Sequence, residues 1–114
     1  MKKIIINLKR RTDRKESFLN NNPKLKDFDF LEAFDSKNIT HHQLLNLGFG
    51  THPFWKDPHH NRKITSGEVG CAISHMKAWK LCAESDSPLV IFEDDAVIVD
   101  KLFNESEIEN LIGD

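Results

Sequence analysis

The sequence predicts a single α/β domain over residues 1–114, with a mainly parallel sheet and flanking helices. Strand and helix patterns take turns along the chain, as in folds whose parallel strands are connected by helices. The strongest strand candidates are residues 3–7, a β-branched run, and residues 89–92, a short continuous apolar run that is typical of strands inside a parallel sheet. Two capping-box motifs also mark helix starts between these strands.

The first part of the chain is expected to fold as strand, helix and strand. Residues 3–7 are a β-branched run that ends at Asn7 and a basic stretch, so we expect a buried strand followed by a loop. Thr12 is the expected cap of the next helix, which stops before Pro23. Aromatic and acidic residues alternate over positions 27–32, which predicts a second strand.

Two helices and a third strand are expected further along. Thr40 opens a capping box, and Gly48 is the expected left-handed residue after that helix. Thr65 opens a second capping box, and helical periodicity continues to about Ala83. Residues 89–92 then form a strand that we expect to be buried on both faces.

Two further segments have less regular patterns. Residues 49–63 contain prolines, aromatic residues and histidines, and we expect a surface loop near the substrate, because loops of this length are usually functional or mobile. The five histidines between positions 41 and 60 have a spacing that matches no zinc motif. Residues 104–112 have apolar side chains at helical spacing and predict a final amphipathic helix.

Charge and hydropathy narrow the classes of function. The chain has 16 basic and 18 acidic residues and a formal net charge of -2, so we expect no nucleic-acid partner. No apolar run approaches the ~20 residues that cross a bilayer, and the start of the chain resembles a strand more than a signal peptide. We therefore expect a cytoplasmic protein.

The two cysteines, Cys71 and Cys82, both fall in the helix expected after Thr65. Eleven residues of helical rise separate them by about 16 Å, whereas a disulfide needs Cα atoms within about 7 Å. They cannot pair with each other, and we expect both to be small buried hydrophobic side chains.

Three acidic residues, Glu93, Asp94 and Asp95, follow directly on the strand at 89–92. The carboxyl ends of strands in open α/β sheets are where ligands bind. Alternation along an extended strand would put Glu93 and Asp95 on one side and Asp94 on the other. Carboxylate oxygens suit manganese or magnesium held against a diphosphate, so the motif predicts a site for a phosphate-bearing ligand. The alternative is a solvated acidic end to the strand.

One face of the helix after Thr65 has almost no side chain, because Gly67, Gly70 and Ser74 recur at three- and four-residue spacing. A backbone or a ligand can approach such a face closely. Ser74 and His75 can donate and accept hydrogen bonds, and for His75 a structural role and a ligand role both stay open. Three apolar side chains of this helix are expected to face the core: Ala72, Met76 and Trp79.

Near the N-terminus, Asn7 ends the first strand, and Arg10, Arg11 and Arg14 follow within a loop and helix start. Guanidinium groups suit a diphosphate, and an amide suits the edge of a base or ribose. Charge runs are usually solvated, so these arginines alone do not identify a ligand.

Three segments of the sequence resemble successive blocks of glycosyltransferase family 25: residues 6–14, residues 64–75 and residues 90–96. Their order and separations also match, and the resemblance covers nearly the whole chain. The family includes lipooligosaccharide galactosyltransferases and the related collagen galactosyltransferase domains.

The resemblance implies a GT-A type fold, a UDP-sugar donor and a divalent metal, Mn²⁺ or Mg²⁺. Glu93 and Asp95 would be the metal ligands and would act as the family's DxD element. In such a site the metal neutralises charge on the departing nucleoside diphosphate while an acceptor hydroxyl attacks the sugar. The residues implied around the donor are Asn7, Leu8, Arg14, Gly70, Ser74 and His75.

The implied activity is transfer of a hexose, commonly galactose, to a lipooligosaccharide or another glycan. Family catalytic domains continue beyond the acidic motif, so the chain would be their N-terminal, nucleotide-sugar-binding part, truncated relative to the full GT-A fold. Peripheral association with the inner membrane through the acceptor is left open, and no residue is assigned as general base. The alternative is a catalytically incomplete nucleotide-sugar-binding module, or pseudo-enzyme.

Overall fold

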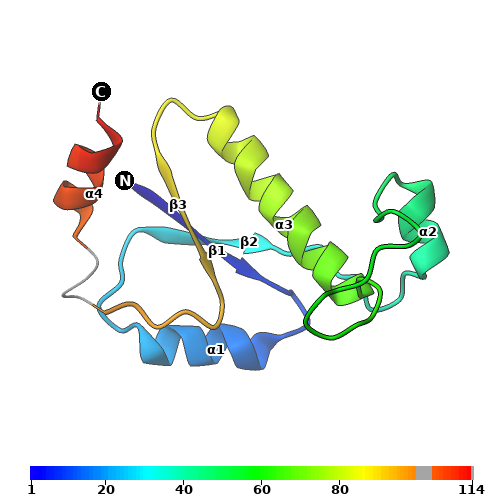
Figure 1. Ribbon diagram of the computed structural model, residues 1–114. Helices are drawn as coiled ribbons and strands as arrows, with labels where there is room; N and C mark the ends of the chain where they lie inside the picture. The colour runs from blue at the N-terminus through cyan, green and yellow to red at the C-terminus, as the bar shows by residue number, and fades with distance from the viewer. Residues whose placement is uncertain (100–103, 114) are drawn as a thin grey trace.

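A computed structural model gives the structure of this chain and describes residues 1–99 and 104–113. At its centre lies a sheet of three parallel strands in the order β2–β1–β3. The strands are β1 Lys2–Asn7, β2 Phe28–Glu32 and β3 Leu89–Glu93. Helices flank this sheet (Figure 1), so the predicted α/β class with a parallel sheet is confirmed.

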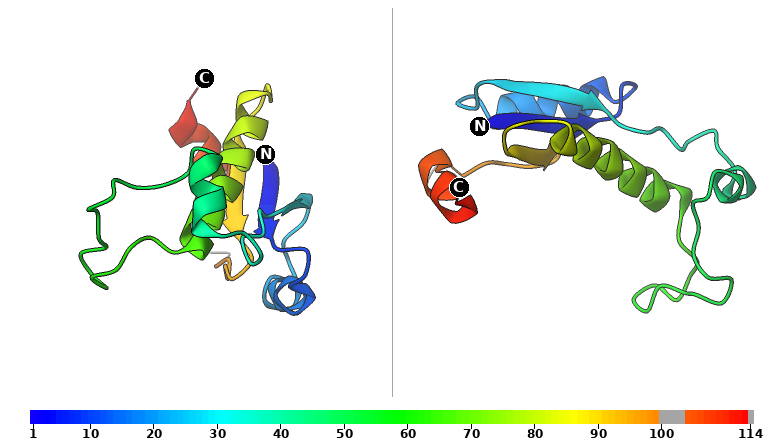
Figure 2. Two further views of the ribbon diagram at one scale, coloured as in Figure 1. Left: turned by 90° about the vertical axis from the view of Figure 1, so that its right-hand side faces the viewer. Right: turned by 90° about the horizontal axis from the view of Figure 1, so that it is seen from above.

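Two helices, α1 Thr12–Asn21 and α3 Ser66–Ala83, cover opposite faces of the sheet (Figures 1 and 2). The chain runs from β1 to β2 on one side, then crosses back to β3 on the other side of β1. Because crossovers between parallel strands are right-handed, this reversal puts the two helices on opposite faces. The carboxyl ends of β1 and β3 therefore form a topological switch point, the usual ligand crevice of α/β sheets.

The central strand β1 is buried along residues 3–7, as its β-branched run predicts. The expectation that residues 89–92 are buried on both faces is wrong, because these residues are only half-buried. The reason is position in the sheet: β3 pairs with β1 on one side and has no second neighbour among the described strands.

Helix α1 begins at Thr12 itself, so the prediction that Thr12 is its cap is wrong. Arg11 occupies the cap position, and no side chain there accepts a backbone hydrogen bond. The Arg11 N–H instead donates to the carbonyl oxygen of Leu8 at 2.9 Å, which closes a turn and starts the helix one residue earlier. Phe18 of α1 is buried and packs edge-on against two aromatic side chains of β2, Phe28 and Phe30.

Both capping boxes are confirmed. Thr40 and Thr65 each accept a hydrogen bond from the backbone N–H three residues later, and the side chain at that later position accepts from the cap residue's N–H. The first box begins the short helix α2 His41–Asn46, and the second begins α3. Gly48 has a φ of +90°, so it is the left-handed residue expected after α2.

The buried face of α3 includes the small residues Gly70 and Ser74. The expectation that Ala72, Met76 and Trp79 face the core is wrong. Met76 and Trp79 are 48% and 60% exposed, and Ala72 is exposed with them. Val69 and Ile73 instead join Leu44 of α2 in a core cluster. Five residues of α3 are buried: Val69, Gly70, Ile73, Ser74 and Ala78.

The remaining segments surround this centre. Residues 49–63 contain no helix or strand, as predicted, and extend away from the sheet (Figure 2). The final helix α4 Glu105–Ile112 is confirmed, with Asn104 as its cap. Lys3 of β1 is buried and forms an ion pair with Glu105.

The cysteines are both free, as predicted from their separation. The expectation that they are buried is wrong, since Cys71 is exposed and Cys82 is half-buried. None of the described helices has the length and apolar character that a bilayer-spanning segment needs.

Candidate functional site

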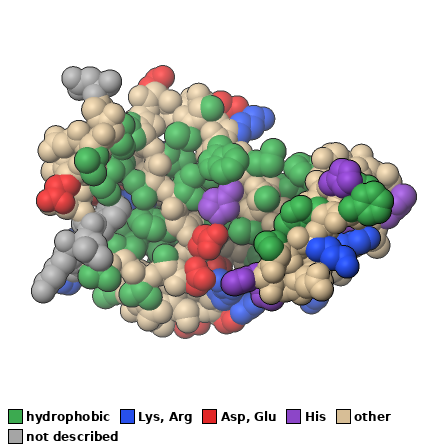
Figure 3. Space-filling view, viewed as in Figure 1, with side chains coloured by type: hydrophobic (Ala, Val, Ile, Leu, Met, Phe, Trp, Pro, Cys, Tyr) green, Lys and Arg blue, Asp and Glu red, His purple; other side chains and the backbone are tan. Residues whose placement is uncertain are grey.

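The candidate site lies at the carboxyl ends of β1 and β3, where the fold forms its switch point. Asn7 ends β1 and Glu93 ends β3, and the two strands are paired so that Ile6 lies opposite Glu93. In the space-filling view, acidic side chains and a histidine gather at the middle of this face of the molecule (Figure 3). The strand ends, α1 and α3 all contribute residues to this region.

Asp94 is the buried centre of the acidic motif. Its Oδ2 accepts a hydrogen bond of 2.9 Å from the Asn7 side-chain amide, and its Oδ1 lies 2.6 Å from the Arg14 guanidinium. The Asp94 side chain is 10% exposed. This carboxylate therefore connects the end of β1, the start of α1 and the end of β3.

Sequence reasoning assigned ligand roles to the two neighbours of Asp94 but not to Asp94 itself. The structure supplies the register that the sequence does not specify: Ile6 lies opposite Glu93, so the next residues along the chain, Asn7 and Asp94, also lie side by side. An amide beside a carboxylate after paired strands is a good hydrogen-bonding pair.

The expected alternation of Glu93 and Asp95 does not apply, because β3 ends at Glu93 and a turn follows. The Ala96 N–H closes this turn on the Glu93 carbonyl oxygen at 3.1 Å. Asp95 is 68% exposed, and its carboxylate lies 3.8 Å from Arg14. Metal binding by Glu93 and Asp95 stays a prediction, with both carboxylates accessible to solvent.

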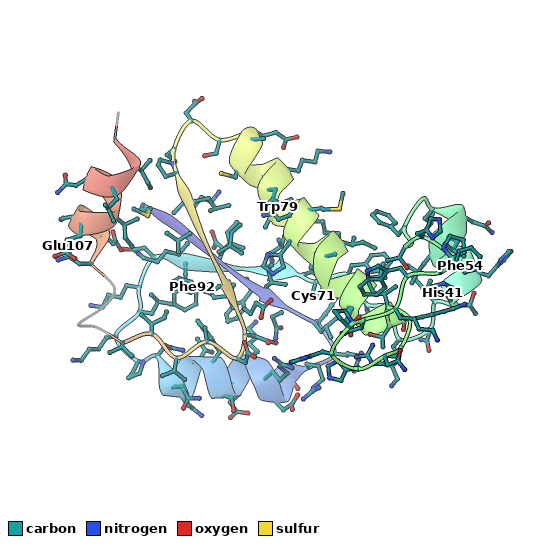
Figure 4. All side chains as sticks on the ribbon, viewed as in Figure 1. His41, Phe54, Cys71, Trp79, Phe92 and Glu107 are labelled. Carbon is teal, nitrogen blue, oxygen red and sulfur yellow. The ribbon has the colours of Figure 1, made fainter. Side chains whose placement is uncertain are left out.

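Glu93 turns toward α3 and contacts two of its side chains. Its Oε1 lies 3.0 Å from His75 Nε2 and accepts a hydrogen bond from Cys71 Sγ at 3.6 Å. Cys71 is labelled on α3 in Figure 4. The hydrogen bond with His75 is the main cause that lowers the pKa of Glu93. Burial, followed by the charge of Glu93, raises the pKa of the Cys71 thiol.

Gly70 and Ser74 attach α3 to the segment after β2. Ser74 Oγ accepts a hydrogen bond from the Phe34 N–H at 2.9 Å and donates one to the Gly70 carbonyl oxygen at 2.8 Å. A Cβ on Gly70 would lie 2.9 Å from Ser36 Oγ and 3.3 Å from the Phe34 carbonyl oxygen. The predicted close approach of a backbone is confirmed here, whereas Gly67 is exposed.

A pocket of about 280 Å³ lies between these elements. It is lined by the end of β1, the segment after β2, α3 and the acidic motif. The lining includes predicted site residues from all three motif segments: Leu8, Arg14, Gly70, Ser74 and Glu93. Two other predicted residues are one contact away, since Asn7 bonds to Asp94 and His75 to Glu93.

Volume alone does not identify the site. A larger cavity, of about 550 Å³, lies near the start of β1, where Lys3 and Glu105 are among its lining residues. This is the amino end of the parallel strands, opposite to the end where α/β sheets bind ligands. It contains none of the acidic motif, so we assign the site to the smaller pocket.

The other predicted arginines have acidic partners near the surface. Arg10 Nε donates to Asp35 at 2.7 Å, and Arg11 forms two hydrogen bonds of 2.9 Å with Asp13. The hydrogen bond from Arg11 lowers the pKa of Asp13 to about 2. Arg10 also lines the pocket, whereas Arg11 does not, so Arg14 and Arg10 are the cations available to a ligand there.

Comparison with known proteins gives a match over residues 1–111 to the family described as "Glycosyltransferase family 25 (LPS biosynthesis protein)". Procollagen galactosyltransferase 1-A of Xenopus laevis is 38% identical over 94 residues, which is 81% of this chain and 15% of the relative. Procollagen galactosyltransferase 2 of Homo sapiens is 38% identical over 94 residues, 80% of this chain and 15% of the relative. The chain thus spans less than a fifth of these relatives, and no solved structure matches it.

Proposed function

The chain belongs to glycosyltransferase family 25, and from this premise we propose that its pocket binds the UDP-sugar donor of a glycosyl transfer. The observation that supports this most is the direct contact between residues of separate motif segments at one switch point. Asn7 and Arg14 both bond to Asp94, and Arg14 lines the same pocket as Glu93. Such a crevice is where α/β sheets bind nucleotides.

The proposed chemistry at the pocket follows from the charges present. Arg14 and Arg10 present guanidinium groups that suit diphosphate oxygens. Asp94 is already bonded to Asn7 and Arg14, so its role is to orient those two side chains. Leu8 adds an apolar surface at the pocket wall.

The acidic motif also fits the divalent metal that the family resemblance implies. Glu93 and Asp95 have side chains 51% and 68% exposed, so their carboxylate oxygens can reach an ion that keeps several of its waters. These are the hard ligands that Mg²⁺ and Mn²⁺ prefer. A bound divalent ion would offset the negative charge that develops on the departing diphosphate.

For the whole protein we propose transfer of galactose from UDP-galactose to an acceptor hydroxyl. The relatives named as procollagen galactosyltransferases support galactose as the sugar. The family description supports a lipopolysaccharide-type glycan as the acceptor. In this reaction the residues of the pocket would bind the UDP-galactose donor.

Calorimetric titration with UDP and UDP-galactose tests the donor site, first with Mn²⁺ and then with excess chelator. Asp95→Ala is the test variant, and Asp86→Ala is its matched control, since Asp86 is exposed and lies before β3, away from the pocket. We expect Mn²⁺-dependent binding in the wild-type chain and the control, and none in Asp95→Ala.

Two results would count against the proposal: no binding by a folded wild-type chain, or binding that survives both chelation and Asp95→Ala. Binding without release of UDP from UDP-galactose in the presence of acceptor would assign this chain the donor-binding role alone.

A further inference from the structure

We propose that Cys71, His75 and Glu93 form a zinc-binding site beside the end of β3. The first two residues come from α3 and the third ends the neighbouring strand. One ligand atom from each of the three residues lies within 4.8 Å of the other two. This inference does not rest on the proposed donor binding. Glu93 is also one of the two residues proposed for the magnesium or manganese ion, so the two sites would share its carboxylate, whereas the thiol and imidazole ligands belong to the zinc site alone.

Secondary structure explains why the three side chains meet. Cys71 and His75 are four residues apart in a helix, so they project from the same face, one turn apart. This face of α3 lies beside the end of β3, where both side chains contact Glu93. Glu93 points at both, which gives the cluster ligands from two elements that are already fixed by the fold.

Two of the ligand distances are close to those of tetrahedral zinc. Zinc binds sulfur at about 2.3 Å and nitrogen or oxygen at about 2.0–2.2 Å, so adjacent ligand atoms lie roughly 3.3–3.6 Å apart. Cys71 Sγ lies 3.6 Å from Glu93 Oε1, and His75 Nε2 lies 3.0 Å from the same oxygen. The ligand atoms of Cys71 and His75 lie within 4.8 Å of each other, and the Glu93 side chain is 51% exposed, so an ion from solvent can reach it.

The ligand types favour zinc over the harder ions. Thiolate and imidazole select zinc, whereas magnesium and manganese prefer carboxylate, carbonyl and water oxygens. Three protein ligands leave a fourth tetrahedral position, and Cys71 is exposed, so water can occupy that position. The ring of Trp79, labelled in Figure 4, lies beside that of His75, with their centroids 6.4 Å apart.

Cobalt(II) is the probe for this site, because a tetrahedral site with a thiolate gives cobalt strong charge-transfer absorption in the near ultraviolet and d–d bands in the visible. We expect both signals to saturate at one equivalent of Co²⁺ and to disappear when Zn²⁺ displaces it. Cys71→Ser should abolish the charge-transfer absorption. Cys82→Ser, which changes the other cysteine of the same helix, should leave it unchanged.

His75→Gln tests the second ligand. Its apparent Co²⁺ affinity should fall by more than the roughly 10- to 100-fold that loss of an outer-shell partner costs. Circular dichroism of each variant establishes that it is folded. The proposal is overturned if the folded wild-type chain shows no thiolate charge-transfer absorption with Co²⁺. Visible d–d bands without that absorption would mean that cobalt binds elsewhere, for example to the histidines of residues 41–60, and would overturn it too. It is also overturned if the absorption persists in Cys71→Ser or is lost in Cys82→Ser.

Discussion

Replacing Asp94 by Asn should destabilise the fold, whereas the same change at Asp95 should not. In Asp94→Asn the amide can still accept from Asn7 with its oxygen, but its NH₂ group then faces the Arg14 guanidinium, donor against donor. A hydrogen bond to a charged group contributes about 1.5–3 kcal/mol. Arg14 is 38% exposed and can turn to water, so we expect the lower part of that range, about 1.5 kcal/mol.

At Asp95 the carboxylate is 68% exposed and 3.8 Å from Arg14, a geometry in which surface ion pairs contribute roughly 0–1 kcal/mol. Asp95→Asn should therefore lower the free energy of unfolding by less than about 0.5 kcal/mol. Urea unfolding followed by circular dichroism measures both values. With a slope of about 1.5 kcal/mol/M, the midpoint of Asp94→Asn should fall by about 1 M.

Equal midpoint shifts in the two variants would refute the reasoning, because they would mean that burial of Asp94 adds nothing to its contacts. A second readout separates structure from ligand binding. Asp95→Asn should weaken Mn²⁺-dependent binding of UDP even though its stability is close to wild type.

Further predictions concern α3 and its start. Ser74→Ala should lower the free energy of unfolding by about 1–3 kcal/mol, since it leaves the Phe34 N–H without its acceptor; thermal unfolding measures the loss, and amide hydrogen exchange at Phe34 should become faster. Thr65→Ala removes the helix cap and should cost about 1 kcal/mol, measured by urea unfolding. The hydrogen bond from Arg62 lowers the pKa of Glu68. The stability that this bond contributes is therefore present at neutral pH and is lost as pH falls from the ordinary glutamate range through the lowered pKa. When the free energy of unfolding is measured against pH, Arg62→Gln should lose less stability over that window than the wild-type chain, and an equal loss would contradict the assignment.

The sequence was most informative where one local interaction determines the structure. Both capping boxes are confirmed, because the hydroxyl of Thr40 or Thr65 and the side chain three residues later are sufficient to define the start of a helix. The left-handed conformation of Gly48 was predictable for the same reason. The turn that starts α1 depends on a backbone contact from Arg11 to Leu8, which no side-chain pattern records.

Long-range features were harder to predict. Hydrophobicity suggested that Met76 and Trp79 face the core, but α3 packs through Gly70 and Ser74, because small side chains let the segment after β2 approach within bonding distance. The contact of Asp94 with Asn7 depends on the register of β3 against β1, which the sequence does not specify.

The helices on opposite faces of the sheet both reach the same pocket, with Arg14 coming from α1 and Ser74 from α3. A ligand bound there is therefore in contact with both layers of the fold, and it shifts the unfolding equilibrium by mass action. At a free concentration of 100 times its dissociation constant, such a ligand adds about 2.7 kcal/mol to the free energy of unfolding. The melting temperature of this chain should consequently rise with ligand concentration, so occupancy of the pocket can be followed by heating the protein.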